Sequence, residues 1–169
     1  MFTIIRLIKL KILFLLFMAV SFNANAFLWF NNTEPPNCNL DEVSELVISI
    51  VKPALKQKFF SPTVAKMTLN RDIDFIVGEA MISEPDYKKW EKQKANNESV
   101  NIVITKIDNM IEESNLELSS IRTISKDENT KKSRCSAELK NSNGNSLQVK
   151  YSAQLTDDGD EIYVEVFNF

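Results

Sequence analysis

The chain contains no histidine. Because histidine is the commonest general base and a frequent metal ligand, its absence excludes Ser-His and Cys-His nucleophile systems and the usual zinc enzymes. Only two cysteines are present, and they lack the CxxC spacing of redox-active and zinc-binding pairs. We therefore expect no metal site, no cofactor and no catalytic residues of the common enzyme classes.

Long hydrophobic runs are also missing. The uncharged apolar stretch near the start covers residues 12–22, whereas a membrane-spanning helix needs about 20 apolar residues. Basic residues precede this stretch and Ala24-Asn25-Ala26 follows it, which is the order of a cleaved export signal. The sequence predicts a signal peptide over residues 1–26, a mature chain starting at Phe27, no transmembrane anchor after cleavage, and a periplasmic or secreted location.

Acidic residues outnumber basic residues in the mature chain. The whole sequence has 20 Lys and Arg against 23 Asp and Glu, and loss of the three signal-peptide cations leaves a net charge of 17 − 23 = −6. An acidic protein repels nucleic acid and anionic lipid. We expect no nucleic-acid partner.

The cysteines, Cys38 and Cys135, would lie in an oxidising compartment after export. An isolated pair in such a compartment favours a structural disulfide. Closing a loop of about 100 residues stabilises a fold by up to about 4 to 5 kcal/mol, because it lowers the entropy of the unfolded chain.

The first half of the mature chain has helical periodicity. After an extended leader over residues 27–37, Asn39 is expected to cap a helix with acidic residues in its first turn. Pro53 is expected to kink or end this helix, and Ser61-Pro62 to begin another. The apolar face of the first helix is predicted to contain Val43, Leu46, Val47, Ile50, Val51, Ala54 and Leu55.

Two further regions are interpreted as helical. The segment 73–82 allows a short helix, and Ser83 is expected to cap another that carries Tyr87 and Trp90. A clearer helix is predicted around residues 100–111, although its β-branched residues also allow a strand. Its apolar stripe consists of Val100, Val103, Ile104, Ile107, Met110 and Ile111.

After Asn115 the hydrophobic period changes from 3.6 to 2. Four strands joined by short turns are predicted, over residues 116–125, 134–140, 147–155 and 162–167. Short hairpins produce an antiparallel meander, and its apolar face needs a cover. We therefore predict one α+β domain over residues 38–169, with N-terminal helices, chiefly the first and that at 100–111, packed on one face of a four-stranded sheet.

Aromatic residues provide the candidate partner-binding positions. Phe27, Leu28, Trp29 and Phe30 would form an unusually apolar mature N-terminus. This segment is either an adhesive arm or a segment that folds back on the core, unless cleavage occurs later. At the other end, Tyr163, Phe167 and Phe169 alternate along the last strand, and an exposed edge there can pair with a partner strand.

Carboxylates provide the remaining candidates. Asp157, Asp158, Asp160 and Glu161 surround a glycine, but they lack calcium-loop spacing and are predicted to form a hairpin turn. Hydrolysis by two carboxylates requires a pair at a set separation. No spacing singles out such a pair among Glu79, Glu84 and Asp86.

The C-terminal half resembles small exported bacterial envelope proteins and lipoproteins of unassigned role. The resemblance rests on Ile121-Arg122-Thr123, the segment 135–139, the segment 151–159 and the segment 163–166. It implies export and supplies no catalytic residues. Such proteins often carry a lipid-anchoring cysteine at the mature N-terminus, where this chain has Phe27.

These observations predict a non-enzymatic protein-binding protein of the bacterial cell envelope. It would act as an accessory subunit or as an inhibitor or immunity-type partner of another envelope or secreted protein. One alternative is a carrier that encloses a small apolar ligand between helices and sheet. A second alternative is a carboxylate-based hydrolase.

Overall fold

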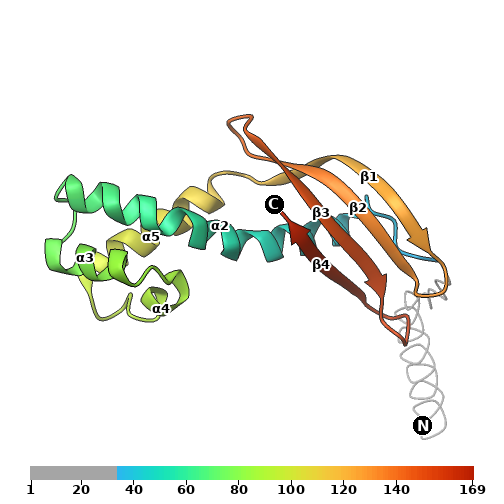
Figure 1. Ribbon diagram of the computed structural model, residues 1–169, viewed down its shortest axis with the longest axis horizontal. Coiled ribbons are helices and arrows are strands. Elements are labelled where there is room, and N and C mark those ends of the chain that lie inside the picture. The colour runs from blue at the N-terminus through green and yellow to red at the C-terminus, as the bar shows by residue number, and fades with distance from the viewer. Residues whose placement is uncertain (1–33) are drawn as a thin grey trace, which may run out of the picture. The chain divides into compact units, whose positions relative to one another are not determined.

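The computed structural model describes residues 34–169, in which four helices precede four strands (Figure 1). The helices are α2 (Asp41–Leu69), α3 (Phe75–Ser83), α4 (Tyr87–Glu91) and α5 (Glu98–Glu112). The strands are β1 (Glu117–Asp127), β2 (Lys132–Lys140), β3 (Ser146–Leu155) and β4 (Ile162–Asn168). The predicted α+β class is confirmed. The predicted signal peptide and most of the predicted leader lie outside the described residues.

Helix α2 is continuous for 29 residues, although it contains Pro53 and Pro62. Pro53 therefore does not end this helix, and the prediction that Ser61-Pro62 begins another is wrong. Each proline removes the backbone hydrogen bond to the residue four positions earlier, here Ser49 and Lys58. Both prolines and both of those residues are exposed, so water can hydrate the freed carbonyl groups.

Two predicted helix caps are also wrong. Leu40, not Asn39, precedes α2, and it provides no side-chain cap. Ser83 is the last residue of α3, and α4 is instead capped by Asp86, whose carboxylate accepts a hydrogen bond from the Lys89 N–H at 3.1 Å. Asp86 takes this role because it directly precedes the helix.

The strands form one antiparallel sheet in the order β1-β2-β3-β4, which confirms the meander. Cys135 pairs with Tyr151, which pairs with Val166. Alternate residues of each strand therefore face α2, and the others face away from it. In β1 the register shifts between Ser119 and Arg122 and again between Thr123 and Ser125.

The described residues enclose two apolar cores, which share α2 (Figure 1). The sheet core lies between the first half of α2 and the sheet. Its buried residues include Val43, Val47, Val51, Leu55, Ala137, Leu139, Val149, Tyr151, Ala153 and Val164.

The helical core lies among the second half of α2 and helices α3, α4 and α5. Its members include Phe60, Val64, Met67, Met81, Tyr87, Trp90, Val100, Val103, Ile104 and Ile107. The expectation that the helix at 100–111 covers the sheet is corrected, because α5 packs mainly on other helices and only Ile111, near its end, joins the sheet core.

The predicted disulfide between Cys38 and Cys135 is present, with their Cα atoms 5.8 Å apart. It fastens the segment before α2 to β2. The Tyr151 hydroxyl donates a hydrogen bond to the Cys38 carbonyl at 2.9 Å, and burial raises the pKa of Tyr151 to about 12. Within the described part of the chain, no helix combines the length and apolar character needed to cross a bilayer.

Candidate functional site

The C-terminal aromatic candidates lie on β4, which is an edge strand of the sheet. Tyr163 is 61% exposed, Phe167 is 53% exposed, and Phe169 beyond the strand is also exposed. The other aromatic candidates, Phe27 to Phe30, lie outside the described residues.

Tyr163 and Phe167 lie on the sheet face that points away from α2, here called the outer face. Lys132, Arg134 and Lys150 lie on the same face, because they alternate with residues buried against α2. The Lys132 ammonium lies 5.9 Å from the centre of the Phe167 ring, within reach of a cation–π interaction. The outer face thus combines exposed aromatic side chains with basic groups.

The basic groups of the outer face differ in their ion pairing. The Lys132 ammonium lies 3.7 Å from the Glu165 carboxylate. Arg134 and Lys150 are exposed and form no ion pair with a described residue. A hollow of about 400 Å³ lies between their side chains and those of Ile124 and Phe167. This surface can accept an acidic group next to an apolar one.

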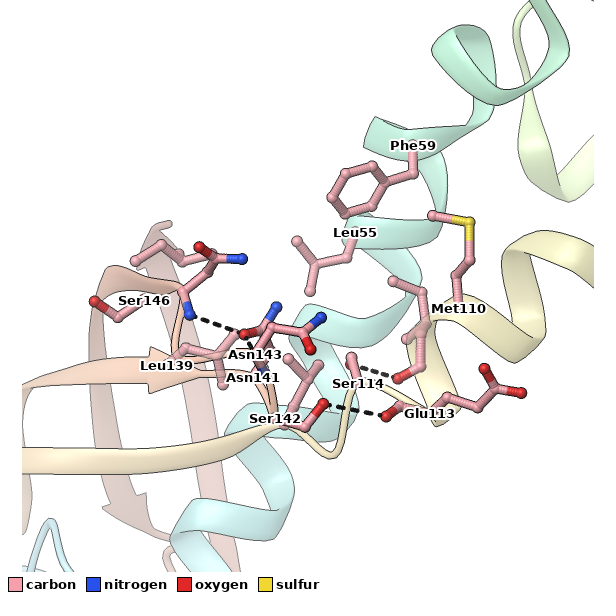
Figure 2. Close-up of a pocket in the computed structure, with 14 residues that line it drawn as sticks. Leu55, Phe59, Met110, Glu113, Ser114, Leu139, Asn141, Ser142, Asn143 and Ser146 are labelled. Carbon is pink, nitrogen blue, oxygen red and sulfur yellow. Dashed lines mark hydrogen bonds between the residues drawn. The ribbon is translucent and has the colours of Figure 1, made fainter. Parts of the chain in front are cut away.

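A second concave feature, here called the junction cavity, lies where the two cores meet and has a volume of about 560 Å³ (Figure 2). Its apolar lining includes the buried side chains of Leu55, Ile111 and Leu139. Phe59 of α2 and Met110 of α5 also line the cavity and are 39% and 41% exposed.

The β2–β3 turn forms the polar side of the junction cavity (Figure 2). The Asn141 side-chain oxygen accepts hydrogen bonds from the backbone N–H groups of Asn143 and Asn145, at 3.1 and 2.9 Å. The Ser142 N–H donates to the Ser114 carbonyl at 2.7 Å. These bonds hold the turn in shape and tie it to the segment after α5.

The polar groups that face the junction cavity are mostly neutral. The side-chain amides of Asn143 and Asn145 make no hydrogen bond with a described residue. Glu113 contributes a carboxylate, and no basic side chain is present among the described residues of the lining.

Helix α3 carries an exposed apolar surface near the end of the helical core farthest from the sheet (Figure 1). Apolar residues occur all around this helix, but only Gly78 and Met81 are buried, and Phe75 and Ile76 are exposed. A Cβ atom on Gly78 would lie 2.2 Å from the Thr68 hydroxyl oxygen, so α3 approaches α2 closely at this point.

Two of the three candidate carboxylates of the helical half have structural roles, and the third, Glu79, is exposed on α3. Glu84 forms an ion pair with Lys89, and Asp86 caps α4. The segment Asp157 to Glu161 is a hairpin turn as predicted, closed by the Thr156 N–H donating to the Glu161 carbonyl at 2.9 Å. Residues 34–169 contain no group of three or more carboxylate or cysteine side chains that could hold a metal ion.

A polar network around Asp108 lies at the partly exposed edge of the helical core. The Asp108 carboxylate accepts a hydrogen bond from the Tyr87 hydroxyl, lies 2.9 Å from the Lys56 ammonium and lies 3.5 Å from the Lys94 ammonium. Burial raises the pKa of Asp108, but the Tyr87 hydrogen bond and Lys56 outweigh it and leave the pKa below its usual value. Burial, together with Asp108, raises the pKa of Tyr87. The network connects α2, α4 and α5.

The sequence allows a ligand cavity between helices and sheet as an alternative, but it does not identify the residues that line the junction cavity. Met110 was assigned to the core stripe and Asn143 to a turn, and Phe59 was given no role. No local signal separates Phe59 from Phe60, because neighbouring residues on a helix can both be buried, as Val103 and Ile104 are in the helical core. Comparison of the chain with protein-family models, with curated proteins and with solved structures found no match.

Proposed function

We propose that the protein is an exported, non-enzymatic protein-binding protein of the bacterial cell envelope. It acts as an accessory subunit or as an inhibitor or immunity-type partner, and it binds through the outer face and the edge of β4. The observation that carries this proposal is the exposure of Tyr163 and Phe167 on the same sheet face as Arg134 and Lys150, which have no ion-pair partner among the described residues.

The side-chain types on the outer face suit a protein interface. Aromatic residues and arginine are enriched where binding energy is concentrated. Full burial of a large apolar side chain contributes about 1.5 to 3 kcal/mol. Tyr163 and Phe167 are therefore expected to supply most of the affinity.

The charge of the outer face and its open edge indicate the kind of partner. The unpaired groups are basic although the predicted mature chain is acidic, so the complementary ligand is an acidic segment. The backbone of an edge strand can pair with an added strand. We expect an extended acidic segment whose apolar side chain enters the hollow between Ile124 and Phe167.

The export part of the proposal rests on two features. The predicted signal peptide over residues 1–26 has the required order of basic, apolar and small residues. The disulfide between Cys38 and Cys135 suits an oxidising compartment. Measurement of the N-terminal sequence of the exported protein checks the cleavage after Ala26.

Cross-linking pull-down from the cell envelope of the native host tests the binding surface. The test variant combines Arg134→Glu, Lys150→Glu, Tyr163→Ser and Phe167→Ser. We expect its affinity for the captured partner, remeasured with purified proteins, to fall at least 10-fold. Retained affinity, or failure of the wild-type chain to capture a partner, would overturn the proposal.

Matched controls separate the outer face from other surfaces. Lys88→Glu with Lys92→Glu makes the same charge change on an exposed part of the α4 region. Phe75→Ser with Ile76→Ser makes the same apolar change on α3. Both variants should bind normally. Loss of binding only in the α3 variant, or only on deletion of residues 27–30, would assign the interface elsewhere.

A further inference from the structure

We infer that the junction cavity is a binding site for a small neutral amphiphile. The ligand would have an apolar body and a head that carries hydroxyl or amide groups. This site is separate from the outer face and does not depend on the proposed protein interaction.

The size and the apolar lining favour a small molecule. The volume of about 560 Å³ lies within the roughly 300 to 1,000 Å³ range of ligand sites. Leu55, Ile111 and Leu139 provide buried apolar contacts at the cavity, and Phe59 and Met110 are exposed side chains that a ligand would cover. The removal of Phe59 and Met110 from water is the expected source of affinity.

The polar side of the cavity selects the head group. The amides of Asn143 and Asn145 each donate and accept hydrogen bonds. These groups have no hydrogen-bond partner among the described residues, so they are available to a ligand. Their mixed donor and acceptor character matches hydroxyl and amide groups.

Charge disfavours an anionic ligand. A carboxylate or phosphate is normally bound by arginine, lysine or several converging N–H groups, and no basic side chain occurs in the described lining. The Glu113 carboxylate repels an anion. Because the Glu113 carboxylate is exposed, solvent screening weakens its attraction for a cationic head group. A neutral head is therefore preferred.

The polar side is held in place before a ligand binds. The Asn141 side chain shapes the β2–β3 turn, and the Ser142 N–H bonds to the Ser114 carbonyl. The turn is thus fixed relative to the end of α5, which carries Met110. Less ordering is needed on binding when the site is already formed.

Titration with n-octyl glucoside below its micelle concentration tests the site in the disulfide-bonded, full-length exported protein. We expect saturable changes in the NMR signals of residues 110–116 and 141–147. Octanoate and octyltrimethylammonium have the same chain length but carry charge, and both should bind at least 10-fold more weakly. Equal or tighter binding of octanoate, or no saturable change with the glucoside, would overturn the inference.

Variants with a matched control show where the glucoside binds. Phe59→Ala should weaken binding at least 5-fold, and Phe75→Ala, which removes another exposed phenylalanine from a helix, should leave it unchanged. Met110→Ala should also weaken it by removing an apolar contact of the cavity, with folding checked by circular dichroism. An equal effect of Phe75→Ala would mean general surface adsorption and would overturn the inference. The outer-face variant should bind the glucoside normally, so this test and that of the protein interaction can fail separately.

Discussion

The sheet core and the helical core share α2 but are held together by different means. In the sheet core, a disulfide joins Cys38 to Cys135, and the Tyr151 hydroxyl binds the Cys38 carbonyl. In the helical core, the Gly78 backbone lies close to the Thr68 side chain, and a network around Asp108 connects three helices.

The difference follows from the distance along the chain between the packed segments. The helical core uses residues from one stretch, 60–107, whereas the sheet core joins residues 38–55 to residues 111–164. Bringing distant segments together costs more chain entropy, and this cost increases with loop length. The covalent link therefore acts in the core that has the longer loop to close.

Loss of the disulfide is expected to have the largest effect on stability. Cys38→Ser with Cys135→Ser should lower the free energy of unfolding by about 4 kcal/mol, because the unfolded chain gains the entropy of an open loop. Urea unfolding followed by circular dichroism measures the change. Trp90 fluorescence, in a Trp29→Phe background, reports on the helical core.

Two outcomes of this measurement sharpen the comparison. If the urea midpoint falls further when followed by circular dichroism than when followed by Trp90 fluorescence, the two cores unfold separately. An equal fall of the midpoint by both methods would show one cooperative unit. Wild-type protein with a reducing agent should behave as the double variant does. An unchanged urea midpoint would contradict the stabilising role of the disulfide.

Gly78→Ala is expected to have the next largest effect, and it acts in the helical core. The added Cβ would lie 2.2 Å from the Thr68 hydroxyl oxygen, so one helix must move. Overpacking of this kind costs about 1 to 3 kcal/mol. Thr68→Ala should restore much of the loss when combined with Gly78→Ala, as measured by urea unfolding with Trp90 fluorescence. If the stability losses of the two single variants simply added in the double variant, the contact between residues 78 and 68 would not be the cause of the Gly78→Ala effect.

Stability at low pH should depend on Asp108. Its pKa in the folded protein lies below the ordinary value of 3.8, so its contribution is complete above the unfolded pKa and is lost as pH falls through the folded pKa. Thermal unfolding between pH 7 and pH 2 measures this dependence. Asp108→Asn should lower stability at pH 7 by about 1.5 kcal/mol, the low end of the range for hydrogen bonds to charged groups, because the carboxylate is partly exposed. If acidification from pH 7 to pH 2 lowered the stability of the variant as much as that of the wild type, carboxylates other than Asp108 would cause the pH dependence.

The smallest predicted effect is a gain in stability in the sheet core. The Ser133 hydroxyl is buried without a hydrogen-bond partner among the described residues. Ser133→Ala removes this unsatisfied group and should stabilise the protein by about 1 kcal/mol. The same change at exposed Ser125 should have almost no effect. A clear loss of stability in the Ser133 variant would show that the hydroxyl has a partner.

Periodic segments could be predicted from sequence because their pattern is local. The stripe at 100–111 became α5 with every member but Met110 buried, and the alternation at 147–155 became β3. The exception is informative, because Met110 lines the junction cavity. A local pattern shows which side of a helix is apolar, but it does not show where the packing partner ends.

Helix α2 could not be predicted as one element. Pro53 opposes continuation of a helix by roughly 3 kcal/mol in the interior of a helix. Packing on both sides of this position, by Val51 in the sheet core and by Phe60 in the helical core, favours the continuous helix. These contacts are made with segments far away in the sequence, so no local signal reports them.

The sequence by itself determined the α+β class, the hairpin order of the strands and the pairing of two lone cysteines, because periodicity, turn residues and cysteine number are properties of the chain. Only the tertiary structure decided that α2 joins two cores and that a cavity forms between them. Three segments build that cavity, around Phe59, Met110 and Asn143. They meet only because α5 packs on α2 while the β2–β3 turn is tied to the end of α5.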